Sequence, residues 1–432
     1  MDTTALVNLA WNILKLVVPL GVIILVHEFG HFIAARMSGV RVLKFSIGFP
    51  PKIAGFKRGE TEYVLGALPL GGYVKLAGEE WGEGAELKPY DLMAKPYWVR
   101  MIMYASGVFM NAILAWLIFF GLFLHGVEFG RFPSKIALTS QSGVAARAGL
   151  RTGDIIVKAG GKPVSSWDEI DKAFDGVGKA GKVDLLARRG SETFKAVIKA
   201  VADPGMEPFV EPVVGTVEPF QPARKAGLKP GDRIVSVNGR KVAMWAEVSR
   251  IVSATPEGKQ VRLRIRRDGK ESDFTVTPRY DASAKRALIG ISAKPSDVGT
   301  EKWGVKDSAV MAGRSIWILS SEIVVSVGKV ITGKAKFKDV LGGPILIARV
   351  GYEKARQGAS ELLHFIAVLS VSLMVVNLLP IPAVDGGMLL LALAEGIRGQ
   401  RFSVKTYQNL ATAGFAFLIA VFILATYHDI LR

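Results

Sequence analysis

The stretch Leu16–Ala35 reads LVVPLGVIILVHEFGHFIAA, an apolar run that contains two histidines and a glutamate. Its length is about the ~20 residues that cross a bilayer as a helix. An ionisable group at membrane depth costs roughly 2.5–3.5 kcal/mol on insertion scales, so such groups usually face a protein interior and serve a function. The stretch therefore predicts a transmembrane helix that carries a functional site.

The spacing of the polar residues indicates which site this is. His27 and His31 are four residues apart, so a helix presents both on one face, where two imidazole nitrogens can bind one zinc ion. A zinc-bound water has its pKa lowered to about 7, and the carboxylate of Glu28 can accept its proton as the water attacks a carbonyl. The alternative is that the two histidines are there by chance and are satisfied in a packed core. This alternative is weaker in a membrane span, because unpaired polar groups cost much free energy there.

Composition places the chain in a bilayer. Half of its 432 residues are hydrophobic and its mean hydropathy is +0.31, which suggests an integral membrane protein with soluble portions. The net charge is +17, but no nucleic-acid-binding motif appears, so we expect lipid headgroups rather than nucleic acid as the partner. The chain has no cysteine, so any zinc ligands must be nitrogen and oxygen atoms.

Four membrane spans are expected, near 16–35, 102–124, 362–379 and 410–427. The stretch 36–100 is basic close to the first span, which predicts that it is cytoplasmic and that the N-terminus lies outside. Charged residues interrupt the apolar stretch Ser308–Gly333, so we expect an amphipathic helix on the outer membrane surface there. Within 36–100, Thr61–Leu65 and Leu68–Val74 indicate a membrane-associated β-hairpin of about 60–76 that bends at a Gly-Gly pair.

The polar region after the second span contains a tandem repeat. Ala145–Val157 recurs as Ala223–Val235, about 78 residues later. Its A-G-L-x-x-G-D pattern resembles PDZ domains, which bind extended peptides by strand addition. Near the end of the second copy, Leu288, Ile289, Gly290 and Ile291 resemble the carboxylate-binding loop of circularly permuted bacterial PDZ domains. We therefore expect a C-terminal peptide ligand for the second copy, and the first shows no clear counterpart of this loop.

A catalytic zinc ion normally has three protein ligands, so a third is needed. Asp385 follows Pro380 and Pro382, which break a helix, and precedes two glycines. With four spans, the first and third helices cross the membrane in the same direction. His31 and Asp385 then lie near helix ends on the same side of the membrane. The alternative is a turn aspartate before Gly-Gly.

Two asparagines near these helix ends are further candidates. Asn377 precedes Asp385 at the end of the third span, and Asn111 lies in the second span with Gly107. Asn377 could contact substrate or support an oxyanion, and Asn111 could contact the substrate or active site; the alternative for both is helix packing through interhelical hydrogen bonds.

These motifs together resemble the site-2 protease family of intramembrane zinc metalloproteases, in particular its regulator of sigma-E protease group with tandem PDZ domains. The resemblance rests on H-E-F-G-H at His27–His31, on N-x-x-P-x-P-x-x-D-G-G at Asn377–Gly387, and on the repeat. It implies one Zn²⁺ per chain on His27, His31 and Asp385, with Glu28 as catalytic base. It also implies that the hairpin receives substrate as an added strand, through Tyr63, Val64, Leu65 and Gly66.

The predicted fold is thus a multi-pass α-helical membrane protein with four transmembrane helices, an inserted pair of α+β PDZ domains and a membrane-associated β-hairpin. The expected segments are 1–125 and 359–432 for the membrane core, 126–206 and 207–296 for the PDZ domains, and 297–358 for the surface helical segment. The resemblance implies a bacterial inner-membrane protein of the envelope stress response, with periplasmic PDZ domains and an active site near the cytoplasmic side.

Three functions are weighed. The first is an intramembrane metalloendopeptidase that cuts single-span proteins, such as a trimmed anti-sigma factor or remnant signal peptides, with the PDZ pair as size filter or docking site. The second is a membrane-anchored PDZ adaptor with a structural zinc site, against which Glu28 argues. The third is a membrane-anchored protease with a solvent-facing site, which the apolar run before His27 disfavours.

Overall fold

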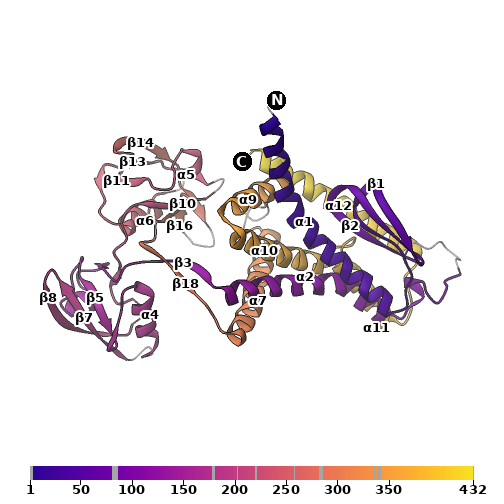
Figure 1. Cartoon of the computed structure of the whole chain (residues 1–432), viewed down its shortest axis with the longest axis horizontal. Helices are drawn as coiled ribbons and strands as arrows, with labels where there is room; N and C mark the ends of the chain where they lie inside the picture. Colours follow the sequence, from indigo (N-terminus) through magenta and orange to yellow (C-terminus); the bar gives the residue numbers. More distant parts are fainter. Residues whose placement is uncertain are drawn as a thin grey trace. The chain divides into compact units, whose positions relative to one another are not determined.

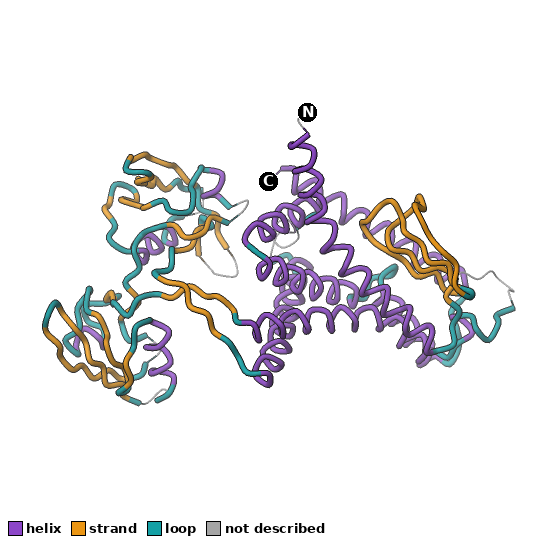
Figure 2. The backbone as a smooth tube through the Cα atoms, in the orientation of Figure 1, coloured by secondary structure: helices purple, strands orange, loops and turns teal. Residues whose placement is uncertain are grey.

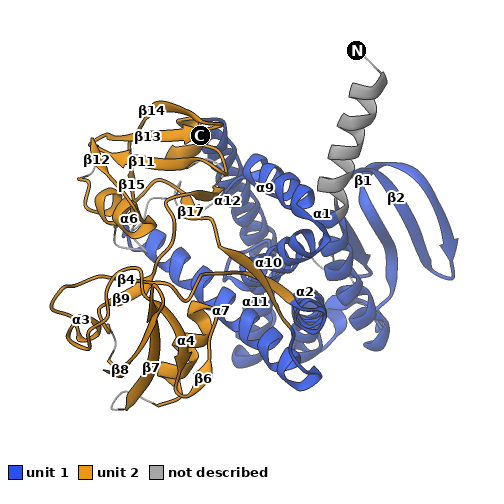
Figure 3. Ribbon diagram, turned by 60° about the vertical axis from the view of Figure 1, so that its left-hand side comes forward, with its two compact units in different colours: residues 1–126, 302–432 blue, residues 127–301 orange. Residues whose placement is uncertain are grey.

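The structure is a computed structural model in which the chain forms two compact units (Figure 3). The first unit joins residues 1–126 to 302–432, and the second consists of residues 127–301. The described residues are 3–79, 86–177, 181–201, 203–218, 221–256, 258–281, 286–334, 337 and 342–431. The second unit is therefore an insertion between two halves of the first.

The first unit is mainly helical (Figures 1 and 2). Its helices are α1 (Thr3–Met37), α2 (Tyr97–His125), α7 (Val305–Ile331), α9 (Pro344–Gln357), α10 (Ala359–Leu378), α11 (Asp385–Arg398) and α12 (Val404–Leu431), with a 3-10 helix at Leu92–Ala94. Helix α2 is the central element, because α1, α7, α10 and α11 all pack against it. Packing by several other helices suits a helix that is apolar around its whole circumference.

Five described helical segments are long and apolar enough to cross a membrane. They are Pro19–Met37, Tyr97–His125, Val305–Ile331, Ala359–Leu378 and Val404–Leu431. The sequence analysis counted four and placed the third of these on the membrane surface. That helix, α7, is the least buried of the five, and its Ala312 packs with Phe119 of α2 and Val371 of α10. The chain is thus a multi-helix membrane protein, with α7 attached to the bundle through one stripe.

Two long antiparallel strands, β1 (Val42–Arg58) and β2 (Thr61–Leu76), form the sheet of the first unit. The first half of β1 lies between the two halves of β2, so that Ile47 is in register with Leu65 on one side and with Gly72 on the other. The chain reverses at Gly59, which has a φ of 65°. The predicted pairing of 61–65 with 68–74 is therefore wrong, because β1 separates these two segments.

The second unit contains two domains that share one order of elements, except that the second has an additional strand pair, β15–β16, before its last strand. The first runs β4 (Ile136–Leu138), α3 (Val144–Arg147), β5 (Ile155–Ala159), β6 (Lys162–Pro163), α4 (Trp167–Asp175), β7 (Lys182–Arg189), β8 (Glu192–Lys199) and β9 (Met206–Pro208). The second runs β10 (Val214–Val217), α5 (Pro222–Lys225), β11 (Arg233–Val237), β12 (Arg240–Lys241), α6 (Trp245–Ser253), β13 (Val261–Arg267), β14 (Lys270–Val276), β15 (Arg279–Asp281), β16 (Arg286–Leu288) and β17 (Ile291–Ala293). Their four-stranded sheets have the orders β6-β5-β7-β8 and β12-β11-β13-β14. Strands β3 (Val127–Arg131) and β18 (Asp297–Glu301) pair where the chain enters and leaves the unit.

The Gly-Asp pair of the repeat has the same structural role in both domains. Asp154 accepts two hydrogen bonds of 2.8 Å from the guanidinium of Arg189, and Asp232 accepts two of 2.6 and 2.8 Å from Arg267. Burial works against ionisation of Asp154, but the charge-assisted bonds from Arg189 outweigh it and lower the pKa of Asp154 below its usual value. In the first domain, the aspartate of the motif therefore connects the turn before β5 to the end of β7. In the second domain, it connects the turn before β11 to the end of β13.

Candidate metal centre

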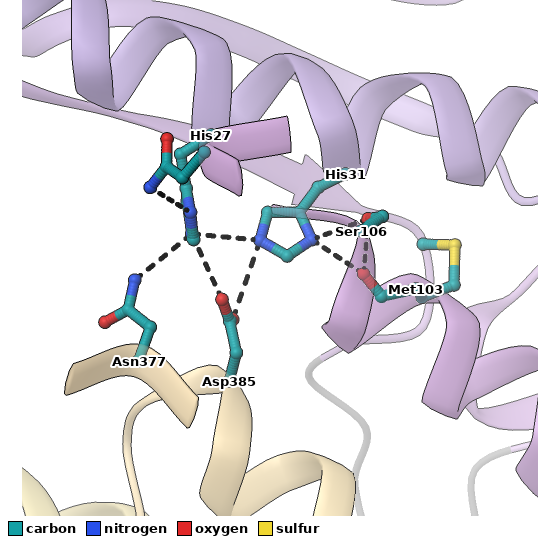
Figure 4. Close-up of polar contacts among 7 residues, drawn as sticks. His27, His31, Met103, Ser106, Asn377 and Asp385 are labelled. Atoms are coloured by element: carbon teal, nitrogen blue, oxygen red, sulfur yellow. Dashed lines mark hydrogen bonds and ion pairs between the residues drawn. The ribbon is translucent and has the colours of Figure 1, made fainter. Parts of the chain in front are cut away.

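Two imidazoles of α1 and one carboxylate of α11 converge in the first unit (Figure 4). Asp385 lies 3.1 Å from His27 (Oδ2 to Nε2) and 3.5 Å from His31 (Oδ1 to Nε2). The two Nε2 atoms are 3.3 Å apart, and all three ligand atoms lie within 4.8 Å of one another. The structure thus brings together the three residues that the sequence analysis named as metal ligands.

The environment of Asp385 fits a metal ion. Its Oδ2 atom is buried and makes no hydrogen bond to any described residue, although His27 Nε2 lies nearby. An unpartnered carboxylate oxygen costs free energy away from water, and a cation between the three side chains would satisfy it. Two imidazoles and one carboxylate form a donor set that zinc binds, with the fourth tetrahedral position left for water or substrate.

Helix α2 supplies the groups that orient the imidazole of His31. Its Nδ1–H donates to the backbone carbonyl of Met103 at 2.8 Å, and the hydroxyl of Ser106 lies 3.3 Å from the same Nδ1 (Figure 4). Because Nδ1 carries the proton, the Nε2 lone pair faces Asp385 and is available to a metal ion.

Asn111 orients the other imidazole. Its amide Nδ2 lies 3.3 Å from His27 Nδ1, while its Oδ1 is buried without a partner among the described residues. A half-turn of the amide, which leaves its shape unchanged, lets Oδ1 accept the Nδ1–H of His27 and leaves Nε2 free for a metal ion. Asn111 has no exposed surface. It is therefore placed to support His27, a contact with the candidate site that the sequence analysis had weighed against helix packing.

A glycine allows α2 to approach both imidazoles. A Cβ atom on Gly107 would lie 2.5 Å from His31 Nε2 and 2.7 Å from His27 Nε2. These distances are far below van der Waals contact, so only glycine fits. Gly107 therefore forms one wall of the site.

The turn before α11 sets the position of Asp385. This residue is the first of the helix, where a negative charge interacts favourably with the helix dipole. Side chains at Gly386 and Gly387 would collide with the carbonyls of Leu379 and Ile381, which explains the two glycines that follow the aspartate. Asn377, at the end of α10, has its Nδ2 3.5 Å from His27 Nε2.

Glu28 lies beside the ligands and against the second half of β2. The backbone amide of Val74 interacts with the Glu28 carboxylate, and a Cβ on Gly72 would lie 3.4 Å from Glu28 Cγ. Among the described pairs, 72–76 pairs only with the first half of β1. The sheet edge at the metal centre is therefore the segment from Gly72 to Val74.

The structure corrects the segment of the sheet that the sequence analysis expected to receive a substrate strand. Tyr63 is in register with Phe45 on one side and Phe56 on the other, and Val64 with Ser46 and Gly55. Tyr63, Val64 and Leu65 are consequently interior to the sheet and cannot accept another strand, whereas Gly66 has one described register partner, Lys52. No local pattern predicted β1, whose two halves pair with Tyr63, Val64 and Leu65 on both sides.

The loop Leu288–Ile291 of the second domain lies between β16 and β17. The carbonyl of Ile289 accepts the amide of Ala223, and Gly290 has a φ of 77°. The first domain has the same arrangement, which the sequence analysis missed: the carbonyl of Pro204 accepts the amide of Ala145, and Gly205 has a φ of 80°. The two loops share this backbone geometry although only the second has an apolar sequence.

The sequence comparisons with known proteins cover nearly the whole chain. The sequence pattern of peptidase family M50 matches residues 15–421. The chain is 32% identical over 455 residues to the regulator of sigma-E protease of Escherichia coli, covering 99% of this chain and all of that one. A Neisseria meningitidis protein whose name classes it with the zinc metalloproteases is also 32% identical, over 98% of this chain and 99% of that one. A solved PDZ domain of an SdrC-like protein from Listeria monocytogenes matches 19% of this chain and 84% of its own length, at 21% identity and a TM-score of 0.18.

Proposed function

This chain belongs to peptidase family M50, and we propose that it is a zinc metalloendopeptidase that hydrolyses peptide bonds in or near the transmembrane segments of single-span membrane proteins. The observation that carries the proposal is the convergence of His27, His31 and Asp385 within 4.8 Å, with Glu28 beside them. Two of the three ligands lie on a helix that is apolar enough to cross a membrane.

His27, His31 and Asp385 would hold one zinc ion per chain. When bound, zinc supplies a Lewis acid that polarises the scissile carbonyl and lowers the pKa of a water ligand to about 7. Glu28 is the general base: its carboxylate accepts a proton from the attacking water and passes it to the leaving amine. The Asn377 amide lies beside His27 and is placed to donate a hydrogen bond to the developing oxyanion.

We propose four spans, with α7 on the membrane surface, and the contacts at the helix ends agree with an even number of crossings, here none, between α2 and α10. The amide of Trp303, just before α7, donates to the carbonyl of Phe123 near the end of α2. The ring of His364, near the start of α10, lies 5.6 Å from that of Phe119. Helices α7 and α10 thus begin beside the same part of α2, so the segment between them makes no net crossing. Helices α1 and α10 then both run toward the metal centre.

This topology gives the proposed orientation in a bacterial inner membrane. The metal centre lies near the cytoplasmic side, where Arg36, Arg41 and Lys44 follow the first span. The inserted domains, which we propose to be PDZ domains, then lie on the periplasmic side. They would act as a size filter or docking site, with a C-terminal peptide as ligand of the second domain.

The sheet edge at Gly72–Val74 supports a way to present substrate. A substrate helix keeps its carbonyls in internal hydrogen bonds, so it must unwind before hydrolysis, and a strand edge replaces the lost bonds. Exposed apolar side chains on the sheet, including Ile53 and Phe56, are those expected of a surface in contact with lipid. We infer that substrate binds as an added strand along this edge, beside Glu28.

A cysteine cross-linking experiment tests this edge, and the absence of native cysteines provides a clean background. Lys75→Cys lies on the proposed edge strand, and Lys57→Cys is a matched exposed position on the strand at the other side of the sheet. In a Glu28→Gln background, a substrate with one cysteine near its cleavage site should cross-link to Lys75→Cys at least about ten times more than to Lys57→Cys. Equal cross-linking at both positions, or a preference for Lys57→Cys, would contradict the proposed substrate edge.

The relatives' names indicate which substrates to try. The Escherichia coli and Salmonella typhimurium relatives are named regulators of sigma-E protease. We therefore propose trimmed single-span anti-sigma-factor-like proteins as substrates, with remnant signal peptides as a second class.

Reconstitution tests the proposed function. The purified chain, co-reconstituted in liposomes with a tagged single-span protein, should release fragments, stop after zinc chelation and resume on adding Zn²⁺. Zinc binding without cleavage, together with capture of a free C-terminal peptide by the second domain, would favour the adaptor instead.

A further inference from the structure

A buried ion pair joins α2 to α11 in the first unit. Arg100 and Glu395 form it through Nη2 and Oε2, and both side chains are only 2% exposed. The hydroxyl of Tyr407, on α12, donates to Glu395 Oε1 at 3.1 Å and lies 3.2 Å from Arg100 Nη1. The amide of Phe402 donates to the same Oε1 at 2.7 Å. Both carboxylate oxygens of Glu395 are therefore hydrogen-bonded inside the protein.

The helix that carries Arg100 also carries the groups around the histidines. Met103, Gly107 and Asn111 follow Arg100 at helical spacing, so they lie along one side of α2. Glu395 lies on α11, the helix that starts at Asp385, and is about 15 Å from Asp385 along the helix axis at 1.5 Å per residue. Helix α2 therefore contacts both imidazoles directly and reaches the third ligand through α11.

Charge fixes the register of two helices in a way that apolar contacts do not. In a bilayer the hydrophobic effect gives little preference between apolar helix–helix and helix–lipid contacts, so apolar faces can slide. A slip of one residue moves a helix by about 1.5 Å, whereas metal–ligand distances tolerate only about 0.2 Å. A buried charge that must meet its partner allows one register.

We propose that Arg100 and Glu395 are positioning residues: they fix α11 on α2 and thereby hold Asp385 at metal-binding distance from His27 and His31. This inference rests on the ligand set of the proposed function. A purely structural role is the competing explanation, and the two can be separated. Replacing a buried ion pair by apolar residues of similar volume often preserves stability. Such a replacement removes the register constraint without leaving a charge unpaired.

The experiment compares two double variants of the full chain. Arg100→Met/Glu395→Leu removes the buried pair. Lys354→Met/Glu361→Leu makes the same substitutions at the more exposed pair between α9 and α10. We expect both to keep a Tm close to that of the parent chain. The first should bind Zn²⁺ about 10–100-fold more weakly in chelator competition, with an altered d–d spectrum of bound Co²⁺, and the second should change neither.

Two results would overturn the inference. If the Arg100→Met/Glu395→Leu chain folds and keeps the parent's zinc affinity and Co²⁺ spectrum, the ion pair has a purely structural role. If that variant does not fold, Glu395→Gln decides, since it keeps the shape of the side chain and removes the charge that pairs with Arg100: unchanged zinc affinity contradicts the inference, and weaker affinity with an altered Co²⁺ spectrum supports it. The zinc affinity of Asp385→Asn is measured in the same experiment. If that variant keeps the parent's zinc affinity, Asp385 is not a ligand and the proposed function's ligand set is wrong.

Discussion

Glu28→Gln is expected to keep zinc in the site and to lower the cleavage rate by about 10²–10⁴-fold, the usual contribution of general acid–base catalysis. Glutamine has nearly the shape of glutamate, so it fits beside Gly72 and Val74, but it cannot accept a proton. Glu28 is not one of the three converging ligands. Cleavage of a reconstituted single-span substrate, together with zinc content by elemental analysis, measures both quantities.

Glu322→Gln is the matched control, because Glu322 is an exposed glutamate on α7 in the same unit. It should cleave at the parent rate. A Glu28→Gln chain that cleaves as fast as the parent would exclude Glu28 as the base. Loss of zinc from that variant would instead assign Glu28 to holding the metal site.

Gly107→Ala is expected to lower zinc affinity by about 100-fold or more and to abolish cleavage with it. The new methyl group would lie 2.5–2.7 Å from the Nε2 atoms of both histidines, so the imidazoles must move away from Asp385. Displacing metal ligands by more than a few tenths of an ångström breaks the coordination geometry. Chelator competition on the purified chain measures the loss.

Gly121→Ala in the same helix separates this effect from a general effect on α2. A Cβ at Gly121 meets no described atom within 4 Å, and alanine favours a helix interior by about 1 kcal/mol over glycine. This variant should bind zinc as the parent does and unfold at the same or a higher temperature. Parent-like zinc affinity in Gly107→Ala would show that the imidazoles do not meet at this face of α2.

The convergence of His27, His31 and Asp385 could be predicted because two local rules favour it. The four-residue spacing of His27 and His31 places them on one helix face, and the Pro and Gly residues around Asp385 mark a helix boundary. The expected four-span topology then predicts that both motifs lie at the same end of the bundle. The structure confirms that these side chains meet.

The residues that support the site depend on long-range pairing, which local patterns do not encode. The strand pairing within the predicted hairpin was wrong because β1 pairs with both halves of β2. The carbonyl of Met103 was not recognised as a partner of His31, since any helix offers such carbonyls, and contact of Asn111 with the active site was weighed without naming His27 as its partner. Arg100 and Glu395 are 295 positions apart, and no sequence signal links them. The loop at Pro204 and Gly205 is similar to Leu288–Ile291 in backbone rather than in sequence.

The position of the cut tests the central claim most directly. A single-span substrate reconstituted with the zinc-loaded chain is cleaved, and mass spectrometry of both fragments locates the new termini. Intramembrane hydrolysis predicts both termini inside or at the edge of the substrate's apolar segment, and no such fragments with Glu28→Gln. Cleavage confined to the water-exposed part of the substrate, far from that segment, would contradict the account.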